Sequence, residues 1–235
     1  MEVHPVRKYR HLFFDLDHTL WDFRTNSRAV LLELHAELKL EERGIPEAGF
    51  ASVYEAVNAE LWKSYDGGVI PKDVLRALRF RKSLEHFKVK DARLAKQLEE
   101  TYMDRCPNRS ALNPGVFELL QALRQHYRMH IITNGFLETQ TLKLAASGIR
   151  PFFDVLLTSE QAGANKPSAR IFRHALRSAG AKTSESLMIG DNVVADIAGA
   201  RNAGIDQAHY SPEVDGDPQA TIRFAHFDEL RVILS

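Results

Sequence analysis

Short apolar runs that end in polar residues recur along the chain. They cover residues 11–14, 130–132, 155–157 and 187–189, and their length and flanking residues predict buried strands. Between them, apolar residues recur at spacings of three and four, which predicts amphipathic helices. Strands that alternate with helices favour a parallel sheet with right-handed crossovers. The pattern therefore predicts an α/β protein with a Rossmann-like core.

Residues 23–110 interrupt this alternation. No strand pattern is found there, whereas apolar residues follow helical spacing at 50–61, 74–78 and 94–102. We therefore expect an all-helical insert at 23–110, with residues 1–22 and 111–235 forming the α/β core. A last strand and short helix are expected within residues 224–234.

Chemically useful side chains follow the predicted strands at the same end. They are Asp15, Asp17, Thr133, Asn134 and Asp191, with Lys166 in a loop that begins a helix. In an open α/β sheet, ligands bind outside the carboxyl ends of the strands, so we expect these side chains to converge. Three carboxylates, a hydroxyl and an ammonium suit Mg²⁺ together with a phosphoryl group, because Mg²⁺ prefers oxygen ligands.

These residues resemble, in order, the four motifs of the haloacid dehalogenase superfamily. The motifs are Asp15-Leu16-Asp17-His18-Thr19-Leu20, Thr133-Asn134-Gly135, Lys166-Pro167, and Gly190-Asp191 with Asp196. The resemblance extends from about residue 9 to residue 210. It implies a hydrolase in which the insert at 23–110 is a helical cap domain that closes over the site and limits the access of water.

The resemblance implies the roles of the acidic residues. Asp15 is the expected nucleophile, which forms an aspartyl-phosphate. Asp17 is the expected general acid for the leaving alcohol and then the base that activates water. Mg²⁺ is expected to bind the carboxylates of Asp15 and Asp191 and the backbone carbonyl of Asp17, while Asp196 supports the site without binding the metal.

Three further residues are expected to bind the phosphoryl group. The Thr133 hydroxyl and the backbone N–H of Asn134 are expected to hold its oxygens, and Lys166 is expected to add positive charge. Taken singly, Lys166 fits a solvated side chain and Thr133 fits a strand-end hydroxyl that satisfies the backbone. Their place at the same predicted edge favours the functional interpretation.

The presence of Asp17 indicates which reaction of the superfamily is favoured. An alkoxide leaving group needs a proton, whereas a halide does not, and dehalogenases of this superfamily lack the second acid. Phosphomonoester hydrolysis is therefore favoured, while a phosphomutase and a phosphatase of sugar phosphates or other small organic phosphates stay open. A non-enzymatic phospho-ligand binder is expected to have lost Asp15, Asp17 or Lys166, and all three are present.

Additional segments resemble the bacterial pyrimidine 5′-nucleotidases of the superfamily. They are His18–Phe23, Leu61–Lys63 with Trp62, Arg79–Phe80, Asn165–Pro167 and Ile171–Phe172. This resemblance implies a nucleoside monophosphate substrate, although Asn192 stands where that group often has serine. For Trp21 and Phe23, packing at the junction of core and insert is expected in preference to contact with a nucleobase.

Composition limits the partners and the cellular location. The 235 residues include 31 Lys and Arg and 31 Asp and Glu, so the formal charge is zero and gives no electrostatic reason to expect nucleic acid or a membrane. No apolar run approaches the roughly 18 residues of a membrane span, and residues 1–10 lack the apolar centre of a secretory signal. With a single cysteine, Cys106, we expect a cytoplasmic enzyme without disulfides, either a monomer or a homodimer.

Overall fold

The computed structural model describes residues 8–213 and 216–235, which belong to two compact units. The core unit contains residues up to Asp22 and from Ser110 onward, and the helical unit contains Phe23–Arg109. Residues 1–7 and 214–215, which the expected core includes, lie outside the described part. No helix among the described residues is long and apolar enough to cross a membrane.

A six-stranded parallel sheet forms the centre of the core unit. Its strands are β1 (His11–Phe14), β2 (Arg128–Thr133), β3 (Val155–Thr158), β4 (Ser186–Gly190), β5 (Asp206–Tyr210) and β6 (Ile222–Phe224). Their order is β3-β2-β1-β4-β5-β6, and each neighbouring pair is parallel. The predicted Rossmann-like α/β core is therefore confirmed. The order reverses between β1 and β4, and such a switch point is where open α/β sheets bind ligands.

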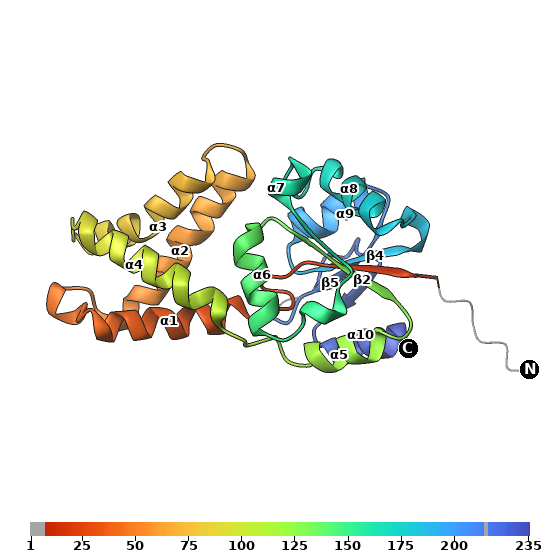
Figure 1. Ribbon diagram of the computed structural model, residues 1–235, viewed down its shortest axis with the longest axis horizontal. Helices are drawn as coiled ribbons and strands as arrows, with labels where there is room; N and C mark the ends of the chain where they lie inside the picture. Colours follow the sequence, from red (N-terminus) through yellow and green to blue (C-terminus); the bar gives the residue numbers. More distant parts are fainter. Residues whose placement is uncertain (1–7, 214–215) are drawn as a thin grey trace, which may run out of the picture. The chain divides into compact units, whose positions relative to one another are not determined.

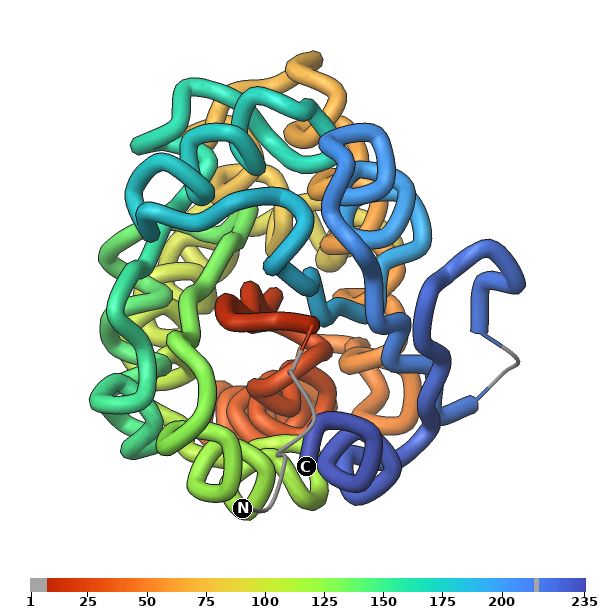
Figure 2. Tube along the Cα trace, turned by 90° about the vertical axis from the view of Figure 1, so that its right-hand side faces the viewer, coloured from red at the N-terminus to blue at the C-terminus, as the bar shows by residue number. Residues whose placement is uncertain are grey.

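Helices cover both faces of this sheet. They are α5 (Val116–Leu123), α6 (Leu137–Ala146), α7 (Ser159–Ala162), α8 (Ala169–Ala179), α9 (Gly199–Asn202) and α10 (Phe227–Leu234). Figure 1 shows α7, α8 and α9 on one side of the sheet and α5 and α10 on the other. Figure 2 shows α10 in dark blue beside α5, with which it packs.

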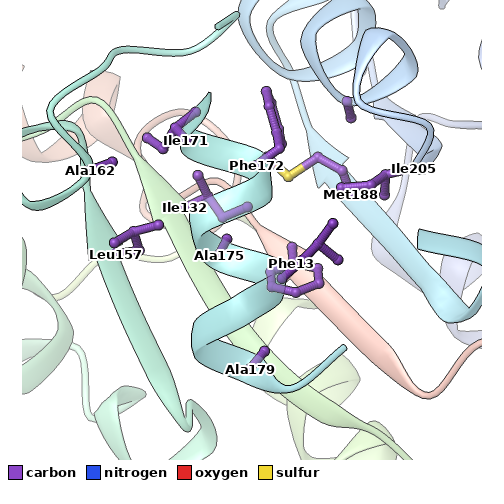
Figure 3. Packing of buried hydrophobic residues seen from close by; sticks show 12 residues of the cluster. Phe13, Ile132, Leu157, Ala162, Ile171, Phe172, Ala175, Ala179, Met188 and Ile205 are labelled. Carbon is purple, nitrogen blue, oxygen red and sulfur yellow. The ribbon is translucent and has the colours of Figure 1, made fainter. Parts of the chain in front are cut away.

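Helix α8 is fixed on the sheet by a buried apolar cluster (Figure 3). Phe172 and Ala175 of α8 pack with Phe13 of β1 and Met188 of β4, and all four are at most 1% exposed. Close packing of this kind leaves little freedom to shift. The loop that contains Lys166 leads directly into α8, so the anchored helix fixes one end of that loop.

The helical unit contains α1 (Phe23–Glu37), α2 (Glu47–Asp66), α3 (Lys72–His86) and α4 (Ala92–Arg105). The rings of Tyr54, Phe80 and Tyr102 pack at its centre, with centroids 4.8–5.5 Å apart. Arg79 is also buried and pairs with Glu99. The guanidinium group of Arg79 is therefore held by an ion pair within the helical unit.

Two buried histidines stack between neighbouring strands of the core unit. His11 Nδ1 lies 3.1 Å from His130 Nε2, and their rings are 16° from parallel. Burial lowers the pKa of both side chains, and the neighbouring His11 lowers that of His130 further, to about 4. The folded chain therefore resists protonation here more than the unfolded chain, whose histidines titrate near 6.5.

This pair predicts a loss of stability in acid. Since the unfolded state binds more protons between about pH 6.5 and pH 4, stability falls as the pH is lowered through that window. Urea unfolding of the wild type should show a decrease in the free energy of unfolding between pH 7.5 and pH 5. We expect this decrease to be about 2 kcal/mol smaller for His130→Gln. The exposed His126 provides the control variant His126→Gln, which should follow the wild type. Parallel profiles for wild type and His130→Gln would contradict the assignment.

Candidate active site

Asp15 lies immediately beyond β1 at the switch point of the sheet. Its backbone N–H donates to the Ile189 carbonyl at 2.9 Å, so pairing with β4 continues through this residue. Lys166, only 3% exposed, donates from Nζ to Asp15 Oδ1 at 2.5 Å, to Asp196 Oδ1 at 2.6 Å and to the Ile132 carbonyl at 3.0 Å. These three acceptors fix the Lys166 ammonium group beside the Asp15 carboxylate.

Three carboxylates gather at this point. Asp15, Asp191 and Asp196 each offer an oxygen within 4.8 Å of the others. Burial raises the pKa of Asp15 well above its ordinary value, and the charges of Asp196 and Asp191 add to the rise despite the opposing Lys166. Burial also raises the pKa of Asp191, with Asp196 contributing. A single ammonium therefore compensates this acidic group incompletely, and a bound cation would favour its ionised form.

The oxygen donors of this group fit Mg²⁺. Both oxygens of Asp196 are engaged, Oδ1 with Lys166 and Oδ2 with the Asn192 N–H at 3.1 Å. Oδ2 of Asp15 and Oδ2 of Asp191 accept no hydrogen bond from the described residues. Asp15 and Asp191 are thus available as hard oxygen ligands, whereas Asp196 holds Lys166 and the backbone in place.

Local backbone structure after β4 positions Asp191 and Asp196. Asn192 Oδ1 accepts from the N–H groups of Val194 and Ala195 at 3.0 and 2.8 Å, and so begins the π-helix Val193–Ala198. At Gly190, a Cβ atom would lie 2.4 Å from Asp196 Oδ2. Asn192 is therefore a helix cap, and only glycine at position 190 leaves room for the Asp196 carboxylate.

Two residues that the sequence did not single out fix Asp191. The Thr19 hydroxyl donates to Asp191 Oδ1 at 2.7 Å. His209 Nδ1 accepts from the Asp217 N–H at 2.7 Å, so Nε2 carries the proton and donates to the Asp191 carbonyl at 3.0 Å. Thr19 lies within the first motif, whereas His209 is on β5, which the sequence did not predict as a strand.

The Asp17 carboxylate points to a different set of partners. Lys143 Nζ donates to Oδ1 at 2.5 Å, and Gln140 Nε2 donates to Oδ2 at 2.8 Å. Lys143 Nζ also lies 4.4 Å from the ring centroid of Trp21, which is fully buried. Burial by itself would raise the pKa of Asp17, but Lys143 and Gln140 outweigh burial and lower it. The metal expectation for Asp17 concerned its backbone carbonyl, and that stays a prediction.

The Thr133-Asn134-Gly135 motif, which spans the last residue of β2 and the turn after it, contributes two kinds of contact. Thr133 Oγ1 accepts from the Gly135 N–H at 3.0 Å and from Gln140 Nε2 at 2.9 Å. The Asn134 side chain accepts from the Lys166 N–H at 2.8 Å and donates to the Lys166 carbonyl at 3.1 Å. Asn134 thereby holds the Lys166 loop against β2, while phosphoryl contact by its N–H stays a prediction.

The structure brings Asp15, Lys166 and Asp191 directly together, and it links Asp17 to Thr133 through Gln140. Besides Thr19 and His209, sequence reasoning missed Gln140 and Lys143. The signal in the sequence was two polar residues three apart, and so on one helix face, directly after the Thr-Asn-Gly motif. The structure shows that this face of α6 is buried. Such a pair is unusual on a helix face that packs inward.

This parallel sheet, with its acidic group and buried lysine at the switch point, defines a hydrolase of the haloacid dehalogenase type. The model of the haloacid dehalogenase-like hydrolase family matches residues 9–204, and the chain belongs to this family. Its predicted class as a hydrolase is thereby confirmed.

Individual relatives cover almost the whole chain. It is 35% identical over 208 residues to the pyrimidine 5′-nucleotidase PynA of Streptococcus pneumoniae, covering 87% of this chain and 84% of the relative. It is 33% identical over 227 residues to the pyrimidine 5′-nucleotidase YjjG of Escherichia coli, covering 93% and 96%. The magnesium-bound structure of the putative HAD-hydrolase YfnB of Bacillus subtilis is similar with a TM-score of 0.86 at 29% identity, covering 97% of this chain and 99% of that one.

Proposed function

We propose that this enzyme is a Mg²⁺-dependent phosphomonoesterase that acts through an aspartyl-phosphate on Asp15 and prefers pyrimidine nucleoside 5′-monophosphates. The observation that carries the reaction is the buried Asp15–Lys166 pair beside the Asp191 and Asp196 carboxylates, at the switch point of the sheet. The names of the relatives PynA and YjjG support the substrate.

In the first step the Asp15 carboxylate attacks phosphorus, and the bond to the leaving oxygen breaks. Lys166 holds Asp15 in place and adds positive charge, while the Thr133 hydroxyl and the Asn134 N–H hold phosphoryl oxygens. Lys143 and Gln140 favour the ionised form of Asp17 in the free enzyme, so Asp17 must take up a proton when the dianionic substrate binds, and it gives this proton to the departing alkoxide. Mg²⁺, when held by the carboxylates of Asp15 and Asp191 and the carbonyl of Asp17, supplies charge that offsets the phosphate dianion.

In the second step Asp17 acts as the base. It takes a proton from a water molecule, whose oxygen attacks phosphorus and breaks the bond to the Asp15 oxygen. Inorganic phosphate and the free Asp15 carboxylate result. One residue thus serves in both steps, because it has become a carboxylate by giving up its proton in the first.

We further propose that the helical unit is the cap of this site. The chain leaves the core unit after Asp22 and re-enters it at Ser110. Within the core unit these two connections pair with each other, since the Asp22 N–H donates to the Ala111 carbonyl at 3.1 Å and Trp21 forms a β-bridge with Leu112. The paired connections begin a few residues beyond Asp17, which favours a hinge that links the helical unit to the catalytic loop.

A substrate panel with and without metal tests this function. We expect kcat/KM to be highest for UMP, CMP or dUMP, lower for AMP and GMP, and lowest for hexose phosphates, with free phosphate as the product. Chelation with EDTA should abolish turnover, and added Mg²⁺ should restore it. Asp15→Asn, purified in parallel, controls for contaminating phosphatases. Full activity after chelation would refute the metal dependence, faster hydrolysis of hexose phosphates would refute the substrate, and phosphoryl transfer without phosphate release would favour a mutase.

A further inference from the structure

Two buried polar side chains on α6 contact residues that have different proposed roles, in proton transfer and in phosphate binding. Gln140 is fully buried and Lys143 is 4% exposed, and they lie one turn apart on the helix that follows the Thr133 turn. Gln140 Nε2 donates to both Asp17 Oδ2 and Thr133 Oγ1, at 2.8 and 2.9 Å, while Lys143 Nζ holds Asp17 Oδ1 at 2.5 Å. One amide therefore contacts the proposed acid and a proposed phosphoryl ligand at once.

The direction of these hydrogen bonds constrains Thr133. A hydroxyl oxygen has two lone pairs and one proton. Both lone pairs of Thr133 Oγ1 are used, by the Gly135 N–H and by Gln140 Nε2. The hydroxyl proton is left to be donated, which is the orientation that a phosphoryl oxygen requires.

The packing around Gln140 indicates that stability alone does not account for this side chain. Its Oε1 is buried and has no hydrogen-bond partner among the described residues, which destabilises the fold. A Cβ atom on Gly135 would lie 1.8 Å from Gln140 Nε2, so glycine at this position makes room for the amide. Because a buried apolar side chain of similar length would avoid the unsatisfied oxygen, the amide is better explained by its two donor contacts.

We infer that Gln140 and Lys143 are positioning residues, with Gln140 orienting both the Thr133 hydroxyl toward phosphate and the Asp17 carboxylate toward the leaving group, and Lys143 orienting Asp17 alone. Neither touches the reacting atoms, and both act through the residues that they hold. The inference rests on the proposed function and goes beyond it by separating two tasks. Gln140 serves phosphate binding and proton transfer, whereas Lys143 serves only proton transfer.

Two readouts distinguish these tasks. The inhibition constant of inorganic phosphate reports on Thr133, and the ratio of kcat/KM for UMP to that for p-nitrophenyl phosphate reports on Asp17, because the activated ester needs little proton donation. For Gln140→Glu, which replaces the two N–H donors by a carboxylate, we expect phosphate inhibition to weaken by at least about tenfold and the ratio to fall by about 10²-fold. For Lys143→Met we expect the same fall in the ratio with phosphate inhibition within about twofold of wild type.

Further variants separate positioning from folding. Gln140→Met should keep or raise the melting temperature while lowering kcat/KM, and Lys143→Arg should recover part of the lost ratio. Gln121→Glu makes the same chemical change at an exposed position of α5 and should match the wild type. Gly135→Ala should lower kcat/KM as Gln140→Ala does, because the added Cβ displaces the amide. The double variant should have a kcat/KM little below that of either single variant.

The outcomes are distinguishable. If the wild type hydrolyses no phosphate ester, the proposed function fails. If the wild type is active but Gln140→Glu and Lys143→Met lower kcat/KM equally for both esters and leave phosphate inhibition unchanged, the positioning roles are wrong. If Gly135→Ala and Gln140→Ala are additive, the steric coupling is wrong.

Discussion

Asp15→Asn eliminates the burst of p-nitrophenol from p-nitrophenyl phosphate, whereas Asp17→Asn retains much of it. This is the expected result because Asp15 forms the covalent bond, whereas the side chain of Asp17 only moves protons. General acid catalysis is worth typically 10²–10⁴-fold, and an activated leaving group departs with little of that help. With an alkyl phosphate, therefore, Asp17→Asn should slow formation of the aspartyl-phosphate by about the full factor.

Single-turnover kinetics is the appropriate measurement. Breakdown of the intermediate still needs Asp17 as a base, so the steady-state rate of Asp17→Asn stays low with either substrate. A control for the fold is the urea unfolding midpoint of each variant. If Asp17→Asn lost the burst equally for both leaving groups while Asp15→Asn kept it, the roles assigned to these residues would be reversed or wrong.

Lys166→Met is expected to lose both activity and stability. The ammonium is buried between Asp15 and Asp196, at 2.5 and 2.6 Å, and its removal leaves buried carboxylates without their cation. Removing one partner of a buried pair costs about 3–5 kcal/mol, and loss of an electrostatic contact to the transition state lowers kcat by about 10²–10³-fold. Urea unfolding without added Mg²⁺ and steady-state kinetics measure the two effects.

The stability loss should depend on pH with a definite sign. Without Lys166 the pKa of Asp15 in the folded chain rises further, so the folded state binds more protons than the unfolded state. The free energy of unfolding of Lys166→Met therefore approaches that of the wild type as the pH falls. Adding Asp196→Asn to Lys166→Met removes one uncompensated charge. The double variant should regain part of the stability and none of the activity. Equal stability of Lys166→Met and wild type at pH 7 would show that the pair contributes little.

Several features of this protein follow from local sequence. The runs at 11–14, 130–132, 155–157 and 187–189 lie within β1 to β4, because a short apolar run that ends in polar residues favours a buried parallel strand. The convergence of Asp15, Lys166 and Asp191 follows as well, since parallel strands present their carboxyl ends at one edge.

Other features depend on contacts between distant parts of the chain. Strand β5 (Asp206–Tyr210) mixes polar and apolar residues, and its pairing with β4 is what makes it a strand. Arg79 belongs to a basic run, and Glu99, which lies 20 residues away in sequence, turns it into a buried ion pair.

The sequence by itself determined the α/β class, the strand ends and the residues able to carry the chemistry, because periodicity and residue type are local properties. Only the tertiary structure decided which acid has which neighbours. Lys166 pairs with Asp15, whereas Asp17, two residues further on, is held by Lys143 and Gln140, 126 and 123 residues away in sequence. The physical reason is that a side chain's electrostatic environment depends on distances of a few ångströms in space, which sequence spacing does not specify.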